Sequence, residues 1–211
     1  MSWIERPPLF FRMLVPGGIF RVRNISPGTM QSGGKSIYLT FDDGPVPEVT
    51  PWVLDLLDRY GIKATFFMVA DNARRYPHLL EEVRRRGHRI GNHTFHHMQG
   101  AKVPTRTYLR DVAEADRLLH TDLFRPPHGW LRPRQARALR SRYRIVMYDL
   151  VTRDYSRRLD SEAVVRNVRR YARPGAIVVF HDSIKAWPRL EEALPRAIQW
   201  LTEQGYVFAT L

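Results

Sequence analysis

Two groups of acidic and imidazole side chains could carry out chemistry in this chain of 211 residues. The first is the pair Asp42-Asp43, which follows the alternating apolar pattern of residues 35–41 and precedes Gly44-Pro45. Neighbouring side chains on a strand point to opposite faces, so one carboxylate can serve a metal ion while the other faces a reactant. Taken alone, the pair is equally well explained as two solvated acids at the entrance to a loop.

The second group is the run of residues 93–97, His-Thr-Phe-His-His. Side chains four positions apart meet on one face of a helical turn, so His93 and His97 are expected to bind the same metal ion. Asp43 offers a third ligand, and a fourth position open to water would make the site catalytic rather than structural. His96 is a competing ligand at a spacing of three, but the spacing favours His97 and leaves His96 beside the site or in solvent. An isolated pair at this spacing is more often two surface histidines.

Three further polar clusters follow predicted strands, at residues 125–129, 154–155 and 181–182. In a parallel β/α barrel the carboxyl ends of the strands converge on one face, and catalytic residues gather there. Together with the two groups above, these clusters predict a single active site on that face.

Predicted strands and helices alternate along the whole chain. Strands are expected at 35–41, 64–69, 88–92, 123–124, 145–148, 176–180 and 206–209, and helices at 49–60, 77–86, 108–119, 133–141, from 160 and at 190–201. This order predicts an α/β protein with one parallel sheet, most simply closed into a (β/α) barrel. An open, doubly wound sheet is the alternative.

The stretch Thr40-Phe-Asp-Asp-Gly-Pro45, together with His93 and His97, resembles the polysaccharide deacetylases of the NodB-homology type, carbohydrate esterase family 4. The resemblance extends to five motifs between Thr40 and His181. It implies a single distorted (β/α) barrel of seven or eight parallel strands. We place this barrel at residues 35–211, preceded by an N-terminal arm, residues 1–34, that packs on it. The resemblance also implies hydrolysis of N-acetyl, or less often O-acetyl, groups of a glycan.

The resemblance implies a role for each matched residue. The implied catalytic residues are Asp42, Arg125, Asp154 and His181, the metal ligands are Asp43, His93 and His97, and the candidate substrate contacts are Pro127, His128, Gly129, Trp130, Tyr155 and Trp187. Asp42 would take a proton from a metal-activated water, and His181 would protonate the leaving amine. Three matched positions differ from the family pattern: His128 replaces an aromatic residue, Tyr155 a tryptophan and Val179 a leucine.

The chain contains no cysteine, which excludes disulfides and thiolate metal ligands. A metal must therefore be held by histidine and carboxylate, which suits zinc best, with cobalt, nickel or manganese as other candidates. The net charge of +13 is compatible with an anionic partner or with a basic solvated exterior. No nucleic-acid-binding motif accompanies it, so we expect no nucleic-acid partner, and no obligate protein partner is evident.

No stretch reaches the roughly 18 apolar residues that would span a bilayer, and residues 1–22 lack the pattern of a signal peptide. We therefore expect a cytoplasmic or inner-membrane-associated protein, whose N-terminal arm is a candidate for peripheral membrane contact. The candidate substrates are a peptidoglycan fragment, a chitin-like oligosaccharide or a lipid-linked sugar. A glycan-binding barrel without turnover, or a deformylase or cyclic-imide hydrolase on the same fold, remains as an alternative.

Overall fold

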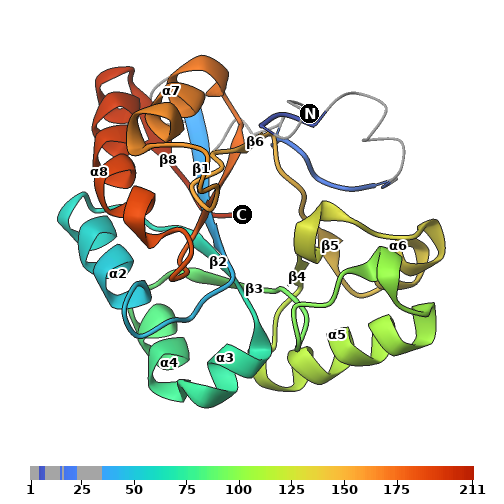
Figure 1. Cartoon of the computed structure of the whole chain (residues 1–211). Helices are drawn as coiled ribbons and strands as arrows, with labels where there is room; N and C mark the ends of the chain where they lie inside the picture. The colour runs from blue at the N-terminus through green and yellow to red at the C-terminus, as the bar shows by residue number, and fades with distance from the viewer. Residues whose placement is uncertain (1–4, 8–14, 16, 23–34) are drawn as a thin grey trace, which may run out of the picture.

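The computed structural model describes residues 5–7, 15, 17–22 and 35–211 (Figure 1). Within these residues, eight strands form one sheet: β1 (Lys35–Asp42), β2 (Thr65–Met68), β3 (Arg89–Asn92), β4 (Leu123–Phe124), β5 (Arg144–Ile145), β6 (Leu150–Val151), β7 (Ile177–His181) and β8 (Tyr206–Phe208). The α-helices are α2 (Thr50–Arg59), α3 (Ala70–Arg75), α4 (Pro77–Arg85), α5 (Thr105–Leu119), α6 (Pro133–Leu139), α7 (Ser161–Tyr171) and α8 (Trp187–Glu203). Two short 3₁₀ turns, η1 (Gly100–Lys102) and η2 (Pro127–Gly129), lie in the loops.

All pairings between these strands are parallel, in the order β5-β4-β3-β2-β1-β7-β6, with β8 beside the first half of β1. The sheet is curled and the helices surround it, as Figure 1 shows. This arrangement confirms the predicted distorted barrel, and the strand count agrees with the upper value expected. The register places Asp42 of β1 beside Phe67 of β2 and His181 of β7.

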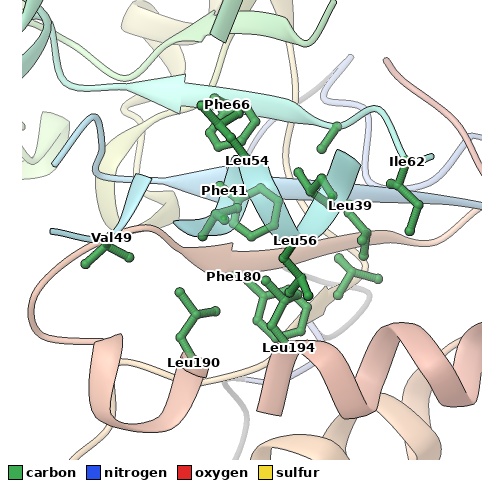
Figure 2. Close-up of a cluster of buried hydrophobic side chains, with 14 of the residues drawn as sticks. Leu39, Phe41, Val49, Leu54, Leu56, Ile62, Phe66, Phe180, Leu190 and Leu194 are labelled. Carbon is green, nitrogen blue, oxygen red and sulfur yellow. The ribbon is translucent and has the colours of Figure 1, made fainter. Parts of the chain in front are cut away.

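The alternation along β1 separates two buried environments. Its odd-numbered residues, Ile37, Leu39 and Phe41, belong to the main hydrophobic core beneath α2 and α8 (Figure 2). There Phe41 stacks between Phe66 and Phe180, at ring-centroid distances of 5.0 and 6.1 Å. Fully burying one such ring stabilises the fold by about 2–3 kcal/mol, so the central strand is firmly held.

The even-numbered residues of β1 face the opposite side of the sheet. Tyr38 packs there in a separate small cluster with Phe67. Arg125 lies fully buried on this side, with its guanidinium carbon 4.0 Å from the centre of the Phe67 ring. Period-two alternation therefore carries Asp42 to the side of the sheet on which Arg125 is buried.

One helix and one strand were not predicted, and several predicted elements have different bounds. Helix α3 and strand β6 were missed. Of the strand expected at 145–148, only the first residue belongs to β5, and the second forms an isolated bridge. The helix expected at 133–141 ends at Leu139, and the helix expected from Leu190 begins at Trp187. Trp187 therefore starts a helix rather than lying in a loop.

Only part of the predicted N-terminal arm is described, so its role as a separate element stays a prediction. Ile19 forms a parallel bridge with Val146, and the amide of Val151 donates to the Glu5 carbonyl at 2.8 Å. Phe20 is buried in a hydrophobic cluster with residues of α5 and α6. Among the helices of the described residues, none combines the length and the apolar character needed to cross a membrane.

Candidate active site

The carboxyl end of β1 opens into a pocket of about 560 Å³ that contains both Asp42 and Asp43. The expectation that the two side chains point to opposite faces is wrong, because the strand ends at Asp42 and Asp43 has a φ of +80°. That left-handed conformation interrupts the alternation of a strand. Both carboxylates therefore reach the same pocket.

The structure brings Asp43, His93 and His97 together, with one ligand atom from each lying within 4.8 Å of the others. The Asp43 Oδ1 atom is 3.1 Å from His97 Nε2 and 3.7 Å from His93 Nε2. The His93 side chain is buried, whereas those of Asp43 and His97 are about a third exposed, at 31% and 33%. One carboxylate and two imidazoles at the wall of an open pocket fit a divalent metal ion with a position left for water.

The segment that carries the two histidines is not helical, which corrects the sequence-based expectation. Thr94 and His97 have φ values of +65° and +54°. The amides that a helix would bond internally are bonded elsewhere: Thr94 donates to the Asn92 side chain, and Phe95 and His96 donate to Asp111 Oδ2. A loop fixed by side chains therefore brings His93 and His97 together, with ring centroids 5.1 Å apart.

His96 does not join the cluster, as the spacing argument anticipated. Its Nδ1 lies 2.5 Å from Asp111 Oδ1, and its side chain is largely exposed. It is thus a neighbour of the site rather than a member of the ligand group.

His93 is held in a form suited to metal ligation. Its Nδ1 lies 2.8 Å from the main-chain carbonyl of Arg125, so Nδ1 carries the hydrogen and the lone pair remains on Nε2, toward Asp43. Burial lowers the pKa of His93 to about 4, with the nearby His97 also lowering it. The imidazole is therefore neutral at pH 7, as a metal ligand must be.

The second carboxylate, Asp42, is paired with Arg125. The Arg125 Nη1 atom donates to Asp42 Oδ1 at 2.6 Å and to Thr40 Oγ1 at 2.8 Å. Its Nη2 donates to the Met147 carbonyl at 3.0 Å, which fixes the guanidinium in its buried position. Charge-assisted hydrogen bonds of this kind are strong and fix the orientation of a carboxylate.

His181, at the end of β7, is paired with Asp154. Its Nδ1 lies 2.8 Å from Asp154 Oδ1, and its amide donates to Asp154 Oδ2 at 2.7 Å. Burial alone would lower the pKa of His181. The charge and hydrogen bond of Asp154, together with the smaller effects of the charges of Asp43 and Asp42, raise this pKa to about 9. At neutral pH this imidazole therefore carries a proton that it can donate.

The turn after Asp43 is held by a third buried carboxylate, which was not among the predicted site residues. Asp182 accepts hydrogen bonds from the Gly44 amide at 3.1 Å and from Thr50 Oγ1 at 2.6 Å. A Cβ at Gly44 would lie 2.0 Å from Asp182 Oδ2, so only glycine allows this close approach. Burial raises the pKa of Asp182 to about 8.

The remaining predicted contacts are divided between the pocket and the protein interior. His128, Gly129, Trp130 and Tyr155 line the pocket together with Pro7, Pro126, Tyr148, Val151, Val179 and Lys185. Pro127 is buried in η2 and is not a lining residue. Trp187 is not brought to the pocket either, because its ring packs edge-on against Trp52 at 5.0 Å.

Four lining residues were missed from the sequence: Pro7, Tyr148, Val151 and Lys185. Tyr148 ends the strand predicted at 145–148, and Lys185 lies shortly after the strand predicted at 176–180, so their positions near strand ends were a usable signal. Pro7 comes from the N-terminal segment, where no pattern marks it as part of a site. His128, at φ +58°, has its ring 4.9 Å from that of His97.

Comparisons with known proteins agree with this fold. The family model for polysaccharide deacetylases matches residues 29–146. A peptidoglycan-N-acetylglucosamine deacetylase of Bacillus cereus is 34% identical over 185 residues, covering 84% of this chain and 86% of that protein. A chitooligosaccharide deacetylase of Sinorhizobium fredii is 31% identical over 198 residues, covering 85% and 92%. The crystal structure of the peptidoglycan N-acetylglucosamine deacetylase Bc1960, with a bound naphthalenyl N-hydroxybenzamide, superposes with a TM-score of 0.77 at 30% identity, covering 85% of this chain and 87% of that one.

The chain belongs to the polysaccharide deacetylase family, carbohydrate esterase family 4 with its NodB-type domain. It is accordingly a hydrolase that acts on carbon–nitrogen bonds other than peptide bonds.

Proposed function

We propose that the protein removes N-acetyl groups from a glycan, with zinc held by Asp43, His93 and His97. The observation that carries this proposal is that Asp42 and His181 line the same pocket as these three ligands. Asp42 is paired with Arg125, and His181 with the buried Asp154. Hydrolysis of an amide needs a base for the attacking water and an acid for the departing amine. The pocket offers one residue for each task.

A divalent ion held by the three ligands would supply Lewis acidity, which polarises an amide carbonyl and makes water more acidic. Asp42 then accepts a proton from the attacking water, and its hydrogen bond from Arg125 fixes the orientation of the carboxylate in the pocket. His181 donates its proton to the amide nitrogen as the carbon–nitrogen bond breaks. Asp154 keeps that proton on His181 at neutral pH.

The substrates named for the relatives, peptidoglycan and chitooligosaccharides, both carry N-acetylglucosamine, and we propose the same sugar here. The pocket supports a sugar by its size and by its aromatic walls, since Trp130 and Tyr155 can stack on sugar faces. Binding of a glycan without turnover is the competing function, and activity decides between them.

The test is release of acetate from an N-acetylglucosamine oligomer by the metal-loaded protein, with and without a chelator. Asp42→Asn should reduce release by about 10²-fold or more, because general-base catalysis contributes about 10²–10⁴. Asp122→Asn is the matched control, since Asp122 also pairs with an arginine, Arg89, but on the exposed surface at 2.8 Å. Chelator-sensitive release that Asp122→Asn leaves unchanged supports the proposal, and no release from a broad panel of acetylated glycans would overturn it.

A further inference from the structure

Lys185 lines the pocket without holding a carboxylate. It lies in the turn of residues 183–186 between β7 and α8, and its side chain is exposed. Among the described residues none forms an ion pair with it. The neighbouring cations differ in this respect, since Arg125 holds Asp42 at 2.6 Å and Arg153 holds Glu5 at 2.5 Å.

The ammonium group of Lys185 is placed close to the reacting residues. Its Nζ lies 5.4 Å from the centre of the Tyr155 ring, within the usual range for a cation over an aromatic face. The same Tyr155 ring contacts His181 in a T-shaped arrangement, with ring centroids 4.8 Å apart. Tyr155 therefore contacts both Lys185 and the proposed proton donor.

The main chain of Lys185 is tied to the loop that carries Asp154. Arg189 donates through Nη2 to the Lys185 carbonyl and through Nε to the Asp154 carbonyl at 2.5 Å. One guanidinium thus fixes the start of the lysine side chain relative to the His181–Asp154 pair. Only the flexible stem remains free to adjust, which suits the capture of a charged group at a pocket rim.

We infer that Lys185 binds a carboxylate of the glycan, so that the preferred substrate is an acidic glycan with carboxylates near its N-acetylated sugars rather than a neutral oligosaccharide. This inference rests on the proposed function and names its substrate class. A carboxylate is the group that an unpaired ammonium beside a sugar-binding ring can recognise, whereas a neutral oligosaccharide offers it only hydroxyls and amides. The net charge of +13 also favours binding of an acidic glycan, because it raises the local concentration of an anionic polymer.

The test measures binding to the full-length, metal-loaded protein that carries Asp42→Asn, so that the glycan stays intact. The probes are peptidoglycan-derived glycan fragments with free carboxylates and the same fragments with those carboxylates converted to amides. Calorimetry should give a dissociation constant about five-fold lower for the free acid, as expected for a partly exposed charge pair. Adding Lys185→Gln should abolish this difference while leaving binding of the amidated fragment unchanged.

Lys35→Gln is the matched control. Lys35 also lies over a tyrosine ring, with its Nζ 5.7 Å from the centre of Tyr206, but at the start of β1, the opposite end of the strand from the site. The Lys35→Gln variant should keep the preference for the fragment with free carboxylates. Equal binding of both fragments to the protein that retains Lys185, or a preference that survives Lys185→Gln, overturns the inference. Either result leaves the proposed function intact, because that function is judged separately by acetate release from a neutral oligomer.

Discussion

The Nδ1–H group of His93 donates to the main-chain carbonyl of Arg125 at 2.8 Å, and the side chain of the same arginine holds Asp42 at 2.6 Å. A single residue therefore orients both a metal-ligand candidate and the proposed general base. Because Arg125 is fully buried and stacked on Phe67, it has little freedom to move. The relative positions of ligand and base are thus set by packing inside the barrel.

Arg125→Met should lower the free energy of unfolding by about 3–5 kcal/mol, because it leaves the buried Asp42 without its partner. Urea denaturation measures this loss. Adding Asp42→Asn should recover part of it, because the uncompensated charge is then removed. Arg89→Met, which breaks the exposed pair with Asp122, should cost about 0–1 kcal/mol. Equal losses for the two arginines would contradict the role given to the buried pair.

The His181–Asp154 pair predicts a pH dependence of activity. With the pKa of His181 near 9, kcat/KM should fall as the pH rises through that value, because the proton donor is lost. A cation bound beside Asp43 would offset the part of this shift that Asp43 contributes. Asp154→Asn should move the alkaline limb to lower pH by about 1–3 pH units. An unmoved limb in that variant would show that another group is the acid.

The same pair contributes to stability in a defined pH window. The folded-state pKa of His181 lies above the ordinary value of 6.5, so its contribution is fully present below about pH 6.5 and is lost as the pH rises toward 9. Melting temperatures of the wild-type protein and of His181→Gln should therefore differ more at pH 6 than at pH 9.5. A difference that is the same at both pH values would contradict the raised pKa.

His97 and His96 are adjacent in sequence but differ in placement, which predicts different effects on metal affinity. His97→Ala should weaken zinc binding by about 100-fold or more, since loss of an outer-shell partner alone costs about 10–100-fold. His96→Ala should change the affinity little, because His96 is turned to Asp111. Titration calorimetry with zinc measures both, and a larger loss in His96→Ala would reverse the assignment.

Gly44→Ala should disturb the turn that presents Asp43. The added Cβ would lie 2.0 Å from Asp182 Oδ2, so the turn must shift, at an expected cost of about 1–3 kcal/mol of stability and a weaker zinc affinity. Gly61→Ala serves as the control. Its Cβ meets nothing within 4 Å, although a φ of +63° makes alanine unfavourable there by about 1 kcal/mol, and it should leave zinc affinity unchanged. Unchanged zinc binding in Gly44→Ala would show that Asp182 does not position Asp43.

The sequence predicted which residues meet in the pocket better than it predicted their local conformation. Asp42, His93, Arg125 and His181 could be assigned to the site because they lie at the ends of predicted strands. The carboxyl ends of parallel strands meet on one face of a barrel. The spacing of His93 and His97 indicated a shared metal but suggested a helix, whereas the loop is set by hydrogen bonds to Asp111, 15 and 16 residues away. Such long-range contacts are invisible to a periodicity argument.

The elements that were missed are those whose identity depends on tertiary contacts. Helix α3 buries only Ala70 and Ala73, which leaves no apolar stripe to detect. Strand β6 has two residues and is a strand only because it pairs with β7. Pro7 reaches the pocket from a segment far from every motif.

The most direct test of the account is a crystal of the zinc-loaded protein with anomalous scattering measured on both sides of the zinc absorption edge. The account predicts one strong peak in the pocket, within bonding distance of an Asp43 carboxylate oxygen and of Nε2 of His93 and His97, with Asp42 still bonded to Arg125. A zinc ion held elsewhere, or one that His93 does not contact, would contradict it.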